Sequence, residues 1–248
     1  MKAGRILDEL WNSAPESGDE FGPRLLKGIP EAVVSYLQHS ILPGTALASA
    51  VKLRMRGSIR LGSWLPFSAT QVLRADGQMI WRARVRKMGL PLTGFDSLVD
   101  GEGRMLWKLL GLVPVVRESG RDVTLSAAGR VRTEMIWLPS VHLLKDTGLS
   151  SGDPGSFTYI LPVCGDSSPV RVSVDERGCP LTVSMERWGN VKDTGYARHP
   201  FGGIVGGEET FGGYTIPSAV RVGWSLVDGR FRDDGEFFRA VIEEAVFR

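Results

Sequence analysis

Apolar and charged side chains alternate over residues 51–61, and this two-residue period constrains the fold more than any other feature of the chain. In VKLRMRGSIRL the apolar residues occupy one phase, and lysine, arginine or serine occupies the other. Residues 78–87 repeat the pattern, with Trp81 on the apolar phase and Arg82 on the polar one. Successive side chains of a strand point to opposite faces, so each segment predicts a half-buried strand of an antiparallel sheet.

Strand-like runs continue along the chain and are separated by turns rich in glycine and aspartate. They are predicted at residues 65–73, 94–100, 103–109, 112–117, 156–163, 169–175, 180–188, 208–212, 214–227 and 231–247. The glycine-rich segment 189–207 is predicted to be irregular.

Helical spacing of apolar residues is confined to a few segments. Helices are predicted at residues 4–12, 30–41, 122–137 and 140–145. Helices and strands do not alternate regularly, which disfavours a parallel sheet. We therefore predict an α+β fold, in which a large antiparallel sheet of about ten strands curls like a half-barrel around a few helices on its concave face. No change of composition marks a linker, so we expect a short helix and loop at 1–29 and a single domain at 30–248.

Composition excludes several classes of protein but selects no partner. The 248 residues include 30 basic and 28 acidic side chains, and 42% are hydrophobic, as in ordinary globular proteins. No stretch approaches the roughly 20 apolar residues of a membrane-spanning helix. The first residues lack the apolar core of a signal peptide, so we expect a cytoplasmic protein. Cys164 and Cys179 form no CxxC pair and are expected to be reduced.

Basic residues are concentrated in residues 51–87, which carry nine basic side chains and one acidic one. The alternation would place Arg54, Arg56, Arg82 and Arg84 on one solvated face. One hypothesis is an interaction surface for anionic partners. The alternative is a solvated face paired with acids from neighbouring strands. No exposed aromatic residues interleave with these arginines, so the signal for nucleic acid is weak.

Catalytic motifs are few. Gly148–Gly152 matches the G-x-S-x-G pattern with Ser150 as nucleophile, and His199 follows downstream, but Asp-Pro-Gly replaces the helix that this motif requires. Glu134 lies in an apolar helical turn, where burial would suit it to acid–base chemistry, or where it would pair with Arg130. The three histidines are far apart, and phosphate-loop and dinucleotide motifs are absent from the sequence. We therefore predict neither a metal site nor a cofactor.

Tryptophans and neighbouring polar residues indicate a binding cleft between the sheet and the helices. The predicted ligand-binding residues are Trp81, Glu134, Trp137, Arg187 and Trp188. We predict a noncatalytic protein that holds a lipid-like or other hydrophobic molecule, with Arg187 or Glu134 orienting its polar head. The alternatives are a hydrolase that uses Ser150 or Glu134, and an interaction module that uses the arginine face.

Several motifs resemble an uncharacterised bacterial family, a domain of unknown function. They are PEAVVSYL (30–37), RLGSWLPFSATQ (60–71), FDSLVDGEGRM (95–105), SAAGR (126–130), WLP (137–139), HPFGG (199–203) and FGGYTIPS (211–218). The resemblance runs from about Pro30 to Phe238 and implies no mechanism. The expected architecture is also similar to the half-barrel of bacterial lipoprotein carriers, and this similarity implies a lipid-like ligand.

Overall fold

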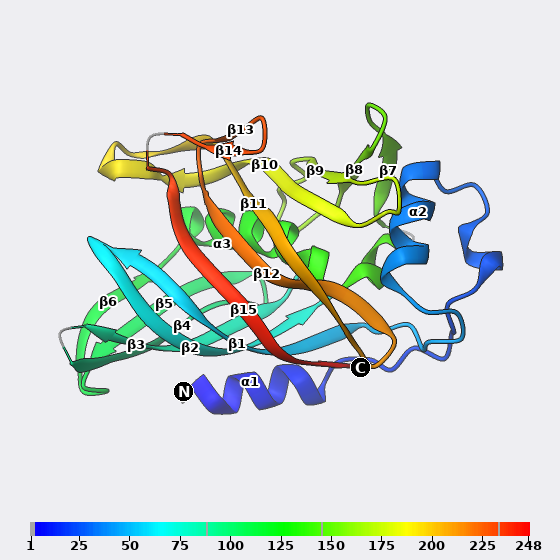
Figure 1. Cartoon of the computed structure of the whole chain (residues 1–248). Helices are drawn as coiled ribbons and strands as arrows, with labels where there is room; N and C mark the ends of the chain where they lie inside the picture. Colours follow the sequence, from blue (N-terminus) through cyan, green and yellow to red (C-terminus); the bar gives the residue numbers. More distant parts are fainter. Residues whose placement is uncertain (1–2, 88, 145, 233) are drawn as a thin grey trace.

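The computed structural model describes residues 3–87, 89–144, 146–232 and 234–248. Thirteen of its strands form one antiparallel sheet in the order β6-β5-β4-β3-β2-β1-β15-β12-β11-β10-β9-β8-β7 (Figure 1). The last strand of the chain lies in the middle of this sheet, paired with β1 on one side and β12 on the other. It therefore joins an N-terminal half, β1–β6, to a later half, β7–β12.

The strands of the main sheet are β1 (Ala50–Leu61), β2 (Ser63–Arg74), β3 (Met79–Lys87), β4 (Leu90–Val99), β5 (Glu102–Leu109), β6 (Val113–Ser119), β7 (Gly148–Ser151), β8 (Ser156–Ile160), β9 (Val170–Val174), β10 (Pro180–Asn190), β11 (Tyr196–Phe211), β12 (Tyr214–Trp224) and β15 (Glu236–Phe247). A separate hairpin consists of β13 (Leu226–Val227) and β14 (Arg230–Phe231). The α-helices are α1 (Ala3–Asn12), α2 (Glu31–Ser40) and α3 (Arg121–Glu134). Short 3-10 helices are η1 (Pro23–Leu26), η2 (Met135–Trp137), η3 (Pro139–Leu143) and η4 (Val191–Asp193).

The predicted alternation is confirmed in β1. Val51, Leu53 and Met55 are almost completely buried, whereas Arg54 and Arg56 are exposed. The buried phase faces the main core because burial of apolar area stabilises the fold, and the charged phase keeps its hydration.

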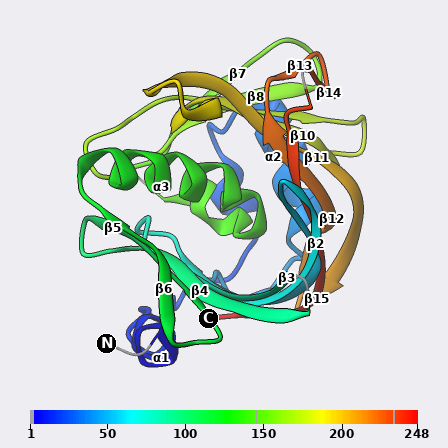
Figure 2. The same cartoon turned by 90° about the vertical axis from the view of Figure 1, so that its left-hand side faces the viewer.

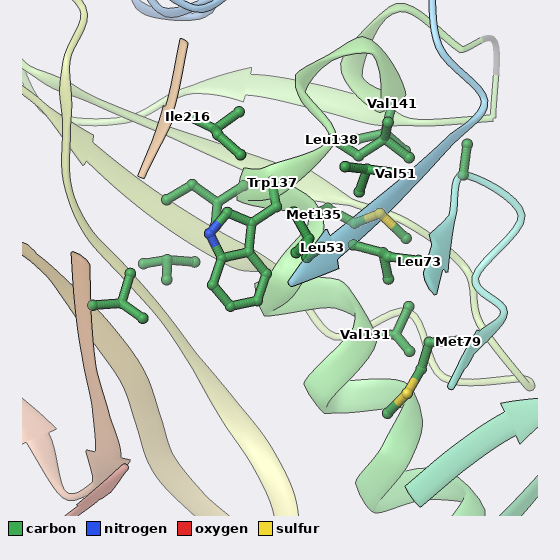
Figure 3. Packing of buried hydrophobic residues seen from close by; sticks show 14 of the residues in the cluster. Val51, Leu53, Leu73, Met79, Val131, Met135, Trp137, Leu138, Val141 and Ile216 are labelled. Carbon is green, nitrogen blue, oxygen red and sulfur yellow. The ribbon is translucent and has the colours of Figure 1, made fainter. Parts of the chain in front are cut away.

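Helix α3 supplies the other side of this core. Its residue Val131 and the following Met135 and Trp137 pack with the buried phase of β1, including Leu53 (Figure 3). Trp137 also donates its indole N–H to the carbonyl of Pro217 on β12, at 3.0 Å. The helix and its 3-10 extension are thus attached to both halves of the sheet.

Helix α1 packs on the opposite face of the sheet from α3 (Figure 2). Its Leu7 and Leu10 form a second, smaller cluster with Val72, Ile80 and Phe95. The prediction that the helices share one face is therefore wrong for α1. The cause is the sequence of β2 and β3, where Val72 and Ile80 make the outer phase locally apolar and require cover.

The predicted sheet is confirmed in part. It is antiparallel, and within the described ranges it has three α-helices beside it and thirteen strands, where about ten were expected. It bends over α3 (Figure 2) but is neither closed nor strongly curled, because β6 and β7 are separate edges. Helix α3 covers part of the inner side, so tight closure of the sheet is unnecessary to shield its apolar face.

The glycine-rich segment contains the largest error of prediction, because most of it belongs to the 16-residue strand β11. A Cβ on Gly202 would lie 2.2 Å from the carbonyl oxygen of Val183 and 2.6 Å from the side chain of Leu226. Position 202 needs glycine because the backbone of Val183 and the side chain of Leu226 approach it closely, and not because the segment forms a loop.

The other predicted helices are present, whereas η1 and η4 lie in segments predicted to be irregular. Those expected at 30–41 and 122–137 are found as α2 and as α3 with η2, and the one expected at 140–145 is η3. Lys145, at the end of that last prediction, lies outside the described residues. No helix in the described ranges combines the length and apolar character needed to span a membrane.

Candidate functional site

A cavity of about 170 Å³ lies between the α3–η2 segment and the inner face of the sheet. Aromatic side chains from β3, β11, β15 and η2 form much of its wall. They are Trp81, Trp137, Phe201, Phe237 and Phe238. Four charged residues also line it, namely Asp96, Arg130, Glu134 and Arg187. The cavity is therefore apolar over most of its surface but contains a few fixed charges, as small-molecule sites commonly do.

Three of these charges form a connected network. Arg130 on α3 donates to Glu134 at 2.7 Å, one helical turn later, and to Asp96 on β4 at 3.1 Å. Gln71 donates to the other oxygen of Glu134 at 2.5 Å, and the indole of Trp107 donates to Asp96 at 2.9 Å. Both carboxylates are thus held by hydrogen bonds to neutral donors as well as to Arg130.

Burial and charge act in opposite directions within the network. Burial raises the pKa of Asp96, although Arg130 and the Trp107 hydrogen bond limit the increase. Burial also opposes the charge of Arg130, but the carboxylates of Glu134 and Asp96 outweigh it and raise the pKa of that guanidinium. Arg130 therefore remains a cation that compensates both acids.

Arg187 on β10 is the fourth charge, and its side chain has no carboxylate in direct contact among the described residues. It is only 9% exposed and donates to the carbonyl and the hydroxyl of Ser126, at 3.1 and 3.3 Å. Its guanidinium carbon lies 4.4 Å from the ring centre of Phe201 and 5.1 Å from that of Trp224. Burial, and then repulsion from Arg130, lowers the pKa of Arg187 to about 9.

Helix α3 has a glycine where Arg187 passes it. A Cβ on Gly129 would lie 2.7 Å from the Cγ of Arg187. The absence of that carbon lets the arginine stem lie against the helix and reach the cavity. Trp81, another lining residue, has a buried indole N–H that finds no acceptor within the described part of the chain.

Four of the five predicted ligand-binding residues line this one cavity: Trp81, Glu134, Trp137 and Arg187. Trp188 does not, because it follows Arg187 by one residue and strand neighbours point to opposite faces. Its indole N–H donates to Asp122 at 2.9 Å, and its ring stacks with Tyr196. The binding role of these residues remains a prediction.

Sequence reasoning missed Asp96 and Phe201 as members of the site. A signal for Asp96 was available, because it shares its strand phase with the buried Leu98, and a charge on a buried phase needs a partner. Phe201 lay in the segment that was predicted to be irregular, so its direction could not be assigned.

The predicted anion-binding face is partly neutralised by acids. Arg54 pairs with Glu243 and Glu244 at 2.9 and 3.0 Å, and Arg56 pairs with Glu243 at 2.9 Å. These contacts match the alternative, in which acids of a neighbouring strand pair with the arginines. Arg82 and Arg84 line a shallow groove beside α1, and neither forms an ion pair with another described residue.

The structure does not bring Ser150 and His199 together. Ser150 is exposed on the edge strand β7, and its hydroxyl contacts only the carbonyl of Thr158, at 3.5 Å. His199 lies on β11, four strands away, which corresponds to roughly 19 Å at the usual strand spacing. The serine also follows no strand-to-helix turn, so the G-x-S-x-G match is a coincidence of a glycine-rich chain.

Among the residues that the structure describes, the cavity lining includes neither serine nor cysteine, and its one hydroxyl belongs to Thr133. That hydroxyl donates to the carbonyl of Arg130 at 2.9 Å. Glu134 uses both carboxylate oxygens in hydrogen bonds. The arrangement is therefore suited to holding a molecule, with its polar groups already oriented, more than to transferring a proton or an acyl group.

Residues 19–233 match a family of unknown function, DUF6544. No curated protein matches the chain significantly. Among solved structures, the LolA superfamily protein NE2245 from Nitrosomonas europaea is 10% identical, with a TM-score of 0.46 over 88% of this chain and 92% of that one. A proposed outer membrane lipoprotein-sorting protein domain from Vibrio parahaemolyticus is 6% identical, with a TM-score of 0.37 over 81% and 86% of the two chains. These neighbours are of the kind expected from the sequence, but at such scores the likeness carries no argument about function.

Proposed function

The chain belongs to DUF6544, a family of unknown function, and we propose its role from the chemistry of its cavity. We propose a noncatalytic binding protein for a small amphipathic anion. The apolar part of the ligand would lie against Trp81, Trp137 and Phe201, and its anionic head would lie at Arg187. The observation that carries this proposal is a buried arginine, without a direct carboxylate partner in the described chain, in an aromatic cavity.

The charge of Arg187 supports an anionic head. A buried cation is costly unless it is paired, and the nearby carboxylates of Asp96 and Glu134 both form their ion pairs with Arg130. An arriving carboxylate could accept two N–H bonds from one guanidinium, which is the strongest common form of such contacts.

The size of the cavity limits the ligand. An engineered apolar cavity of about 150 Å³ in another protein accommodates benzene. A volume of about 170 Å³ therefore matches one ring or a short acyl chain. A longer lipid would have to extend out of the cavity, so we propose a small ligand or only the end of a longer one.

Calorimetric titration of the purified protein with hexanoate, and with 1-hexanol as an uncharged control of similar length, tests the proposal. We expect hexanoate to bind at least about tenfold more tightly than hexanol, equivalent to about 1.4 kcal/mol. Arg187→Met should remove this preference, because it keeps an apolar stem but loses the charge. Equal affinities for the acid and the alcohol in the unmodified protein would contradict an anionic ligand.

A second variant tests the location. A Cβ on Gly203 would meet its nearest atoms at an ordinary 3.5 Å, and the residue lines the cavity. Gly203→Val should therefore leave the fold intact but reduce the space and weaken hexanoate binding. Gly206→Val, on the same strand but outside the lining, is the matched control. Unchanged binding in Gly203→Val would place the ligand elsewhere.

A further inference from the structure

Three potential metal ligands from distant parts of the sequence meet where α2, β11 and the turn before β10 come together. They are His39 on α2, Cys179 at the turn before β10, and Glu208 on β11. Their ligand atoms all lie within 4.8 Å of one another, and the His39 Nε2 atom is 2.7 Å from a carboxylate oxygen of Glu208. Each side chain is half-buried, so the cluster is both ordered by its surroundings and accessible to an ion.

The turn between β9 and β10 places Cys179 next to α2. Asp175 accepts the backbone N–H groups of Arg177 and Cys179 through one carboxylate oxygen, at 2.9 Å each. Gly178 has a positive φ of 84°, and a Cβ there would lie 2.2 Å from the carbonyl oxygen of Ser35 on α2. The turn can therefore touch the helix backbone only with glycine at 178. His39 lies one helical turn after Ser35, which places it beside the cysteine that follows the glycine.

An irregularity in β11 directly precedes Glu208, whose carboxylate belongs to the cluster. The pairing of β11 with β12 shifts register between Val205 and Gly207 and again between Gly207 and Glu208. Bulges of this kind redirect the side chains that follow them and recur beside functional sites. A helix turn, a glycine-dependent contact and a strand bulge thus bring the side chains of His39, Cys179 and Glu208 together.

We propose that His39, Cys179 and Glu208 form a binding site for a divalent transition-metal ion, and that zinc suits it best. An imidazole nitrogen, a thiolate and a carboxylate are the three protein ligand types of zinc, with bond lengths of about 2.0–2.3 Å. Tetrahedral geometry separates ligand atoms by roughly 3.5 Å. The His39 Nε2 atom and the Glu208 oxygen, which are 2.7 Å apart, therefore need to move apart only slightly when an ion binds. Three protein ligands leave the fourth position to water.

The chemistry of this set excludes magnesium and calcium as preferred ions, because those take oxygen ligands almost exclusively. Binding replaces the proton of the Cys179 thiol by the metal, so a proton is released. The ion would connect α2, the β9–β10 turn and β11, and would hold the helix against the sheet. The site shares no residue with the aromatic cavity, so it does not depend on the proposed function.

Cobalt(II) titration of the metal-free, full-length protein tests the site, since cobalt replaces zinc and reports its ligands by absorption. We expect a thiolate-to-cobalt charge-transfer band that saturates at one equivalent and is abolished by zinc but not by magnesium. Cys179→Ser should remove the band, whereas His39→Ala and Glu208→Gln should weaken cobalt binding at least about tenfold. Cys164→Ser is the matched control, because Cys164 is the other free cysteine and is exposed.

Thermal unfolding gives a readout that does not depend on cobalt. Zinc should raise the unfolding midpoint of the unmodified protein and of Cys164→Ser, and should leave Cys179→Ser unchanged. The absence of a charge-transfer band in the unmodified protein overturns the proposal, even where a variant fails to fold. A band that persists in Cys179→Ser, or that disappears in Cys164→Ser, also overturns it.

Discussion

His142 shows how strongly one residue can depend on its surroundings. Its imidazole is buried among the rings of Tyr159, Tyr36 and Phe157, with ring centres 4.6, 5.5 and 5.6 Å away. Burial lowers the pKa of His142 to about 3. The native state therefore keeps the imidazole neutral over a pH range in which the unfolded chain, with an ordinary pKa of about 6.5, takes up a proton.

This difference predicts acid sensitivity at mildly low pH. The stabilisation from neutral His142 is fully present above about pH 6.5 and is lost as the pH falls towards the native pKa, by about 1.4 kcal/mol per pH unit. His142→Leu removes the titrating group and should give a flatter profile between pH 6 and pH 4.5. Urea unfolding at a series of pH values measures both slopes, and parallel profiles would contradict this role of His142.

At the scale of elements, the packing of α3 against the sheet depends on a close approach to β5. A Cβ on Gly103 would lie 2.6 Å from the Cα and 2.7 Å from the nitrogen of Thr124, near the start of α3. The same glycine donates its own N–H to the hydroxyl of Thr124 at 2.8 Å. Because the contact is with helix backbone, a rotation of a side chain cannot relieve it.

Gly103→Ala should therefore push α3 away from β5 and destabilise the protein by about 1–3 kcal/mol, as overpacking usually does. Gly206→Ala is the matched control, since a Cβ there would meet its nearest neighbours at 3.7 Å or more. Chemical unfolding of the two variants measures the difference in free energy. Equal stabilities would show that the helix and strand can separate without cost.

At the scale of the whole molecule, the sheet is open and has an exposed apolar edge. The edge strand β6 begins at Val113, which is 58% exposed, and follows Leu112, which is 76% exposed. Unpaired N–H and C=O groups beside apolar side chains favour pairing with another chain.

We expect the protein to associate through β6 at high concentration, and Val113→Lys to reduce this association. Val241→Lys is the control, because Val241 is 44% exposed on β15 but has paired strands on both sides. Light scattering over a range of concentrations distinguishes the variants. If both lysine substitutions act alike, general surface polarity and not the edge strand controls association.

Local patterns predicted much of the fold and part of the candidate site. Alternation identified β1 and β3, and it assigned Trp81 to the buried phase. The apolar helical turn around Glu134 indicated either a buried carboxylate suited to acid–base chemistry or a pair with Arg130, and the structure contains the pair, at 2.7 Å. These predictions succeeded because the direction of a side chain within a strand or helix is a local property.

Local sequence patterns therefore identified most of the strands and helices, and which side of most of them is buried. Long-range packing sets the rest: β15 lies between β1 and β12, Asp96 meets Arg130, and His39, Cys179 and Glu208 come together. Tertiary packing also explains why β11 is a strand although it is rich in glycine. A side chain at Gly202 would collide with the backbone of Val183 on the neighbouring strand β10. The physical reason is that such contacts join residues far apart in the chain, and no local period encodes which distant neighbour will be present.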